Sequence, residues 1–146
     1  MKMTLIKKFE FEAAHFLPEY DGACSNLHGH TYKLEVGISF DSKKVEKMLS
    51  VGANKEEYNR SNYHLKDVMG LDFKTLKEAV KKMVLQKFDH AFLNDICYIP
   101  TAELLASIIF NSLDEYFMLN MQEERVVLES IKLYETSDSC VVLKRE

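Results

Sequence analysis

The segment from His28 to Phe40, HGHTYKLEVGISF, alternates between two kinds of residue with a period of two. Its odd-numbered positions are polar or glycine, whereas its even-numbered positions are histidine, aromatic or aliphatic. Because successive side chains of a β-strand point to opposite faces of a sheet, this pattern predicts a long strand with one apolar face. That face is formed by His28, His30, Tyr32, Leu34, Val36, Ile38 and Phe40.

A second alternating segment precedes this one and runs from Lys2 to His15. Phe9, Phe11 and Ala13 fall on the same face as His15, whereas Lys8, Glu10 and Glu12 fall on the other face. The pattern predicts another strand that ends near His15. A loop that contains Gly22 and Cys24 connects the two predicted strands.

Two amphipathic helices and two further strands are predicted downstream. Apolar residues recur at helical spacing over 74–88, and a second helix is expected to begin after Pro100 with Thr101 as its N-cap. Strands are expected over 127–135 and 140–143. Antiparallel strands with both helices in the middle of the chain predict an α+β fold with the helices on one face of the sheet.

The length of 146 residues fits one domain, and we expect it to span 1–146. Residues 41–66 are polar, rich in charge and without a sustained period, which predicts a surface insertion with room for a short helix. A hydrophobic content of 47%, with only five glycines and two prolines, excludes collagen-like and disordered classes.

Charge, apolar runs and cysteines indicate the surroundings of the protein. A formal net charge of -4 gives no reason to expect nucleic-acid binding. No apolar run approaches the roughly 18 to 20 residues that cross a bilayer, and the charged N-terminal segment does not resemble a signal peptide. Three cysteines without a C-x-x-C pair fit a reducing compartment. We therefore expect a cytoplasmic protein without membrane partners.

Three of the five histidines are candidates for a metal site. His28 and His30 are two residues apart on a predicted strand, so their imidazoles point to the same face. His15 ends the other strand on its apolar side, and a hairpin of the two strands would bring it to the same point. Three imidazoles with an open fourth position are typical of a catalytic zinc site, whereas a single buried histidine is more often a hydrogen-bonded core residue.

Cys24, Asp89 and His90 are further candidates for chemistry. Cys24 lies four residues before His28, where a thiol could be a fourth ligand, a nucleophile or an acid/base, and spacing alone does not choose among them. Asp89 could orient the imidazole of His90 as a general acid/base, although adjacent Asp-His pairs also occur at helix ends by chance.

Two glutamates, Glu103 and Glu135, are candidates for contacts with a ligand. Glu103 falls in the first turn of the second predicted helix, where an acidic residue is favoured by the helix dipole. Glu135 shares the apolar side of its strand with Ile131 and Leu133, so its carboxylate needs a partner. A ligand with adjacent N–H donors, such as a pterin or guanine, would provide one, and a buried structural salt bridge is the alternative.

Six short motifs follow one another along the chain: FEAAH (11–15), CSNLHGH (24–30), DF (72–73), FDHAFLND (88–95), PTAE (100–103) and LYET (133–136). Together they resemble the 6-pyruvoyltetrahydropterin synthase family. The resemblance implies the tunnelling fold, in which a four-stranded antiparallel sheet carries two helices on one face. It also implies trimers that close into a barrel and stack as hexamers, with active sites between subunits.

The resemblance further implies a role for each matching residue. His15, His28 and His30 correspond to the zinc ligands of the family, and its catalytic set corresponds to Cys24, Asp89 and His90. The residue that anchors the pterin ring corresponds to Glu135, helped by Thr101 and Glu103.

The gap of three residues between Cys24 and His28 resembles the bacterial 6-carboxytetrahydropterin synthases of the queuosine pathway, because the animal pyruvoyl enzymes have a longer gap. This branch implies conversion of 7,8-dihydroneopterin triphosphate to 6-carboxy-5,6,7,8-tetrahydropterin, acetaldehyde and triphosphate. The pyruvoyl-forming activity, a catalytically silent pterin-binding homologue and a non-catalytic zinc-stabilised domain are the alternatives. The chain departs from the family at Leu104, where asparagine is usual, and in the length of its 41–66 insertion.

Overall fold

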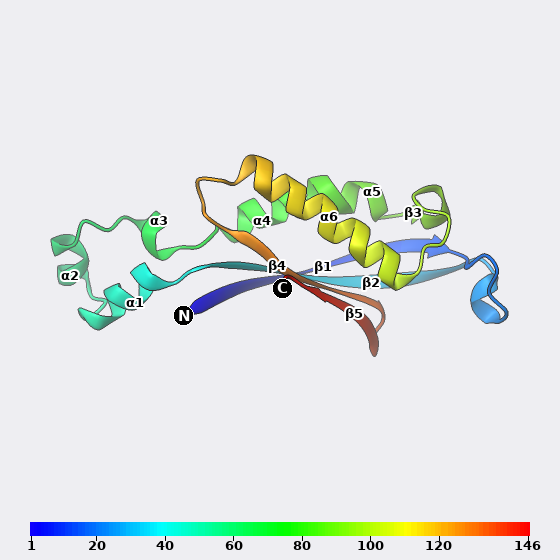
Figure 1. Cartoon of the computed structure of the whole chain (residues 1–146), viewed down its shortest axis with the longest axis horizontal. Helices are drawn as coiled ribbons and strands as arrows, with labels where there is room; N and C mark the ends of the chain where they lie inside the picture. The colour runs from blue at the N-terminus through cyan, green and yellow to red at the C-terminus, as the bar shows by residue number, and fades with distance from the viewer.

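The two long strands predicted at the start of the chain pair over their whole length (Figure 1). The computed structural model describes residues 1–146. In it, β1 (Lys2–His15) and β2 (His28–Asp41) form an antiparallel hairpin. The register runs from Lys2 opposite Asp41 to His15 opposite His28. Because both strands have 14 residues, the end of β1 lies directly beside the start of β2.

The sheet has five strands, in the order β3-β1-β2-β4-β5, and not the four that the sequence predicted. The two expected C-terminal strands are confirmed as β4 (Val127–Thr136) and β5 (Ser139–Lys144). The additional strand, β3 (Ala91–Phe92), runs parallel to the end of β1. A strand of two residues is too short to show an alternating pattern, so the sequence could not reveal it.

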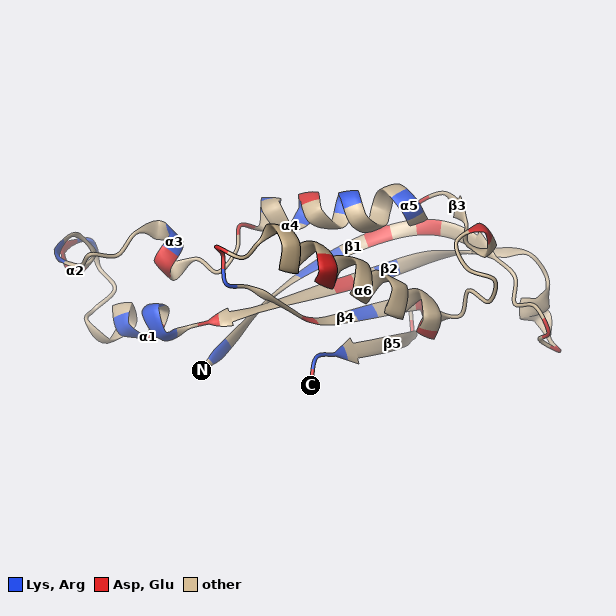
Figure 2. Ribbon diagram, turned by 45° about the horizontal axis from the view of Figure 1, so that its top comes forward, with Lys and Arg blue, Asp and Glu red and all other residues tan.

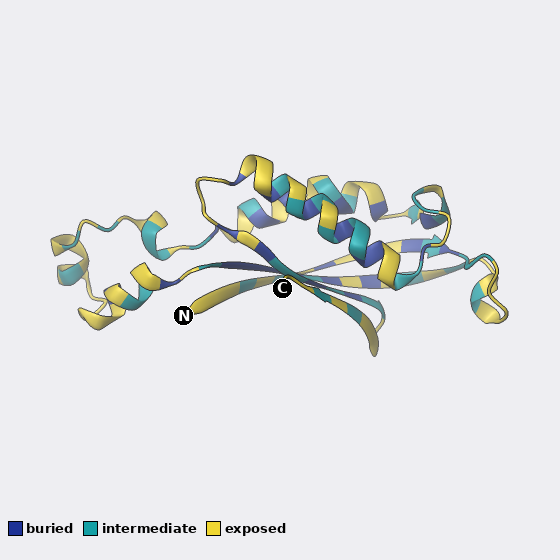
Figure 3. Ribbon diagram, in the orientation of Figure 1, coloured by how far each residue is buried: buried dark blue, intermediate teal, exposed yellow.

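Helices cover one face of the sheet (Figures 1 and 3). The first predicted helix is confirmed as α4 (Phe73–Val80), which continues through a π-helical turn, η2 (Lys81–Leu85), into α5 (Gln86–Phe88). The second is α6 (Ala102–Asn120), and the hydroxyl of Thr101 caps it by accepting from the Leu104 amide. The main hydrophobic core lies between these helices and the sheet. It includes the middle residues of the apolar face of β2, which are fully buried: Tyr32, Leu34, Val36 and Ile38.

The polar insertion forms an arm beyond one end of the sheet (Figure 1). It holds three short helices, α1 (Lys43–Ser50), α2 (Lys55–Arg60) and α3 (Leu65–Val68), so it is more helical than its sequence indicates. Met48 is the only residue of these helices that is buried. The arm leaves β2 at Asp41, the end of the strand opposite to His28.

The other face of the sheet carries no helix and is charged (Figure 2). Glu35 of β2 lies between Lys8 of β1 and Lys132 of β4, and the Nζ atom of Lys33 is 3.9 Å from Oε1 of Glu10. Opposite charges on neighbouring strands attract one another, which suits a face in contact with water. No helix in this structure has both the length and the apolar character that crossing a membrane requires.

Candidate metal centre and active site

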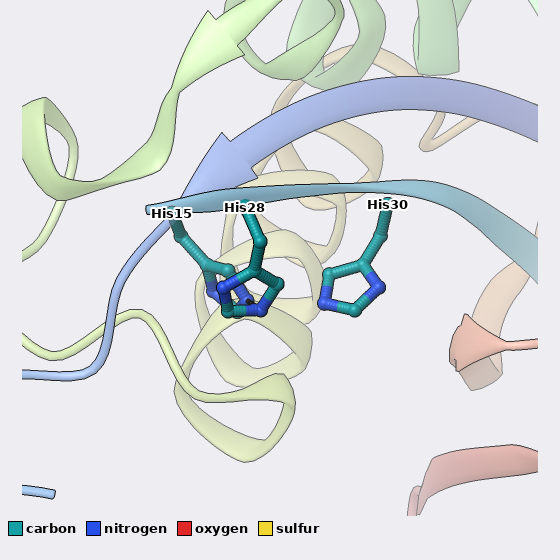
Figure 4. A group of neighbouring side chains, drawn as sticks. All are labelled: His15, His28 and His30. Carbon is teal, nitrogen blue, oxygen red and sulfur yellow. Dashed lines mark hydrogen bonds between the residues drawn. The ribbon is translucent and has the colours of Figure 1, made fainter. Parts of the chain in front are cut away.

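Three histidines from the adjoining ends of β1 and β2 form one cluster (Figure 4). His15 lies opposite His28 in the strand pair, and His30 follows His28 on the same face of the sheet. One ring nitrogen of each histidine lies within 4.8 Å of the ring nitrogens of the other two. The convergence predicted from the sequence is therefore confirmed, because it follows from the register of the hairpin.

Two backbone carbonyls fix how the rings of His15 and His28 present their nitrogens. Nδ1 of His15 lies 2.9 Å from the carbonyl oxygen of Pro100, and Nδ1 of His28 lies 2.6 Å from that of Asn26. Because a carbonyl can only accept, each Nδ1 carries the hydrogen and donates it, and each Nε2 of a neutral ring keeps a lone pair.

The two Nε2 atoms of His15 and His28 face each other at 3.1 Å. Two lone pairs at this distance repel unless a cation or a proton lies between them. Histidine ligands of metals commonly donate their other ring N–H to a backbone carbonyl, which is the arrangement of both rings here. The donor set of three imidazoles with no fourth protein ligand fits a divalent metal such as zinc with one open position.

His30 completes the cluster and is partly buried. Its Nε2 atom is buried without a hydrogen-bond partner and lies 3.7 Å from Oε1 of Glu135. Burial lowers the pKa of His30, the charge of Glu135 partly offsets this effect, and His15 and His28 lower the pKa further. The ring is therefore neutral near pH 7, which is the form that binds a metal.

Glu135 extends from β4 toward the same cluster. The register between β4 and β5 shifts between Tyr134 and Thr136, so that Glu135 is the extra residue of a β-bulge. Bulges change the direction of a side chain and are common beside active sites. No lysine or arginine pairs with Glu135, and its one ion-pair partner is His30. The carboxylate is thus not part of a buried salt bridge with a permanent cation, which favours the alternative of a ligand with N–H donors.

Asp89 and His90 are fixed to the outer edge of β1. The backbone amide of Glu12 donates to Oδ1 of Asp89 at 3.0 Å, and the amide of His90 donates to the Glu12 carbonyl at 2.6 Å. Oδ1 of Asp89 also lies 3.1 Å from Nδ1 of His90. The Glu12 amide and, to a smaller extent, His90 hold the pKa of Asp89 below its usual value. His90 adopts a φ of 58°, a left-handed conformation that is uncommon for residues other than glycine and often marks functional positions.

The imidazole of His90 does not join the histidine cluster of its own chain. It is exposed and borders an open groove of about 450 Å³ whose lining also includes Glu12, Thr31 and His30. The hydroxyl of Thr31 donates to the Glu12 carboxylate at 3.2 Å on the face of the sheet that has no helices. The ring nitrogens of the cluster converge on the opposite face, where Nδ1 of His15 contacts the carbonyl of Pro100, two residues before α6. Within one chain, the Asp89-His90 pair and the three histidines therefore use different faces of β1.

Cys24 lies in η1 (Ala23–Ser25), a single 3-10 turn in the loop between β1 and β2. The amide of Leu17 donates to the Cys24 carbonyl at 2.8 Å, which ties this turn to the residues just after His15. The thiol is half-buried and is not one of the groups that converge on the metal centre. Cys24 is therefore close to the metal ligands in sequence but is not one of the converging groups.

Thr101 and Glu103 lie at the start of α6, directly after the Pro100 carbonyl that holds His15. The side chain of Thr101 is engaged in capping the helix. Glu103 is exposed and forms no ion pair, and the neighbouring Leu104 is 41% exposed. The helix start therefore offers a carboxylate and an apolar side chain near the cluster, both of them uncovered in this chain.

Several residues that support the site were not found from the sequence. Pro100 and Asn26 act through backbone carbonyls, which no side-chain pattern reveals. The side chain of Asn94 accepts from the Phe16 amide at 3.0 Å and donates to the Phe16 carbonyl at 2.9 Å, so it fixes the chain where it leaves His15. An asparagine that follows an apolar residue after a strand was the only available signal for this role.

Comparisons with known proteins agree with this architecture. A family model described as 6-pyruvoyl tetrahydropterin synthase matches residues 4–146. The 6-carboxy-5,6,7,8-tetrahydropterin synthase of Haemophilus influenzae is 36% identical over 155 residues, covering 91% of this chain and 92% of the relative. The protein of the same name from Synechocystis is 34% identical over 113 residues, covering 76% and 74%.

Solved structures show the same fold. The 6-pyruvoyl tetrahydropterin synthase of Caenorhabditis elegans superposes with a TM-score of 0.71 at 21% identity, covering 100% of this chain and 97% of that one. The corresponding structure from Plasmodium vivax gives a TM-score of 0.68 at 18% identity, covering 99% and 98%. The family model covers nearly the whole chain and the superpositions extend over all of its layers, so this chain has the tunnelling fold and belongs to the 6-pyruvoyl tetrahydropterin synthase family.

Proposed function

We propose that the protein is a zinc-dependent 6-carboxy-5,6,7,8-tetrahydropterin synthase of the queuosine pathway. It would convert 7,8-dihydroneopterin triphosphate to 6-carboxy-5,6,7,8-tetrahydropterin, acetaldehyde and triphosphate. The observation that carries this proposal is the cluster of three histidines whose ring nitrogens converge without a fourth protein ligand. The names of the curated relatives from Haemophilus influenzae and Synechocystis, and the short gap between Cys24 and His28, support the carboxy branch.

The residues of this chain have distinct tasks in the proposed reaction. His15, His28 and His30 would hold the zinc ion, which supplies Lewis acidity toward the side-chain oxygens of the substrate. Glu135 would accept two N–H bonds from the pterin ring and so fix its orientation, with Thr101 and Glu103 helping from the start of α6. No nicotinamide or flavin is needed, because the rearrangement is an internal redox reaction.

Proton transfer is assigned to Cys24 and to the Asp89-His90 pair. Cys24, as a thiolate, would remove a proton from the substrate side chain. His90, held by Asp89 through Nδ1, would return a proton from its other ring nitrogen during triphosphate elimination. A positioned acid or base of this kind contributes about 10²- to 10⁴-fold to the rate.

A direct experiment tests the proposal. The purified protein is incubated with 7,8-dihydroneopterin triphosphate, with and without a chelator, and the products are identified by mass spectrometry. We expect 6-carboxytetrahydropterin and acetaldehyde without the chelator and neither product with it. A product that retains the three-carbon side chain would instead assign the pyruvoyl-forming activity. Binding without turnover would assign a silent homologue.

Metal removal also separates the enzyme from a zinc-stabilised structural domain. The main core of 24 buried residues contains none of the three histidines, so the chelated protein is expected to remain folded while its activity is lost. Circular dichroism and the unfolding temperature measure this. A protein that unfolds when the metal is removed would be a domain that the metal holds together.

We further propose that the complete site forms between copies of the chain in a cytoplasmic homohexamer built from two trimers. The support is the placement of the Asp89-His90 pair and the histidine cluster on different faces of β1. A second chain could present its His90 to the cluster of the first, which a single chain does not do in this structure.

Mixed oligomers test this arrangement. A His28→Ala chain and a His90→Ala chain, each nearly inactive alone, are coexpressed with different tags and purified together. If each site combines two chains, random assembly restores about one quarter of wild-type activity, since each half of a site is intact in half of the cases. If each chain serves its own site, the mixture stays as inactive as its components, which would contradict the shared site.

A further inference from the structure

The backbone pairing along the outer edge of β1 ends just before the first metal ligand. The parallel pairing with β3 covers only Ala13 and Ala14 of β1. After β3 the chain turns into η3 (Leu93–Asp95), a 3-10 turn, so its backbone leaves this edge. His15 and the residue that follows it, Phe16, therefore lie beyond the ladder that β3 forms with β1.

The side chain of Asn94 takes over this pairing at Phe16. Its Oδ1 accepts from the Phe16 amide at 3.0 Å, and its Nδ2 donates to the Phe16 carbonyl at 2.9 Å. Asn94 lies 78 residues after Phe16, which is also the separation between the paired residues of β1 and β3. An asparagine amide has one acceptor and one donor group, like the peptide group of a strand. The side chain thus stands where the backbone of a longer β3 would pair.

Asn94 belongs to the short connection from β3 to α6, which contacts His15 a second time. The amide of Cys97 donates to the Leu93 carbonyl at 3.0 Å and so folds the connection back on itself. At its end, the carbonyl of the buried Pro100 lies 2.9 Å from Nδ1 of His15. One segment therefore holds both the backbone that follows His15 and the imidazole of His15 itself.

We propose that Asn94 is a positioning residue for His15. Its amide locks the end of β1 to the connection that carries the Pro100 carbonyl, and so holds the imidazole in the orientation that binds zinc. This inference rests on the proposed zinc site. A ligand that is already oriented loses less freedom when the metal binds. Asn94 acts through the backbone of Phe16 and does not bind the metal.

The test compares the variants Asn94→Asp and Asn94→Ala with the wild-type chain. Asn94→Asp keeps the size of the side chain and the acceptor for the Phe16 amide, but it sets a carboxylate oxygen against the Phe16 carbonyl. Asn94→Ala removes both hydrogen bonds. Competition with a chromophoric chelator measures the affinity for Zn²⁺ alone. We expect the dissociation constant to rise about tenfold in both variants, the lower end of the range for groups that orient metal ligands.

A measurement on the metal-free protein shows whether the effect passes through His15. In chains labelled with ¹⁵N-histidine, NMR follows the ring nitrogens and the exchange of the Nδ1 hydrogen with water. The hydrogen that His15 donates to Pro100 should exchange about tenfold faster in both variants, because the local structure opens more often. The ring signals of His30 should keep their shifts.

Asn120→Ala is the matched control. It removes a comparable hydrogen bond, from Nδ2 of Asn120 to the Tyr116 carbonyl at 2.9 Å, at the far end of α6. The variant should change neither the dissociation constant for Zn²⁺ nor the exchange at the ring of His15. If it changed both as much as the Asn94 variants do, the effect would belong to general stability, which would contradict the proposed role.

The other outcomes are equally distinct. An unaltered affinity for Zn²⁺ in both Asn94 variants would overturn the inference, whatever their unfolding temperatures. If neither variant folds, the wild type decides by hydrogen exchange, because a Phe16 amide without protection would show that Asn94 does not hold it. A wild-type chain that binds no zinc would overturn the proposed function and the inference with it, and this failure is recognised because it does not depend on any substitution.

Discussion

Replacing His28 by alanine is expected to abolish the proposed zinc binding and to lower turnover about 10³-fold or more. The ring supplies one of three nitrogens that converge on the metal centre, and two ligands hold zinc far less tightly than three. A metal that supplies several kcal/mol of transition-state stabilisation corresponds to about three orders of magnitude in rate. Zinc content by mass spectrometry and product formation measure the two effects.

His28 suits this experiment better than His15. His15 is 1% exposed, so its loss would leave a cavity next to α6, whereas His28 is only partly buried and lies outside the main core. The unfolding temperature of metal-free His28→Ala should therefore match that of the metal-free wild type. His64→Ala is the matched control, because His64 is exposed in the arm, and it should keep its zinc and its activity. A His28→Ala protein with a full zinc content would contradict the assignment of the ligands.

The second large effect is expected for Cys24→Ala, which should lose about 10²- to 10⁴-fold in kcat while it keeps its zinc. The thiol is not among the converging metal ligands, so its removal leaves the three nitrogens in place. The bond from the Leu17 amide to Cys24 uses the backbone carbonyl, so the 3-10 turn retains it in the variant. Single-turnover kinetics and zinc analysis of the same preparation separate catalysis from metal binding.

A matched control for the thiol is Cys140→Ala. Cys140 is exposed on β5, and its removal should leave zinc content and kcat unchanged. Cys24→Ala with full activity would contradict the proton-transfer mechanism. A parallel loss of zinc and activity in Cys24→Ala would instead assign the thiol as a fourth ligand, which is the role that spacing in the sequence left open.

The strands and the metal cluster were predictable because both depend on local periodicity. Alternation fixed the faces of β1 and β2, and the equal length of the strands brought His15 opposite His28 once they paired. The start of α6 was also predictable from local sequence, because Thr101 after Pro100 is a typical N-cap. Features of this kind can be predicted from neighbouring residues, without knowing which distant segments come into contact.

Other parts of the site depend on contacts between distant segments. The carbonyl that orients His15 belongs to Pro100, 85 residues further along the chain. The bulge at Glu135 appears only when β4 and β5 pair, and β3 is too short to have a pattern. The sequence motifs assigned Asp89 and His90 to the same catalytic site as the three histidines. Only the fold shows that the Asp89-His90 pair and the histidine cluster lie on different faces of β1.

The arm of α1 to α3 and the metal centre occupy opposite ends of the same pair of strands. Fourteen residues of extended chain separate those ends by roughly 45 Å. Substitutions so far apart, with no shared contacts, are expected to change the folding free energy of a chain additively. A fluorophore or a tether attached to the arm is therefore expected to leave the three histidines of the same chain undisturbed.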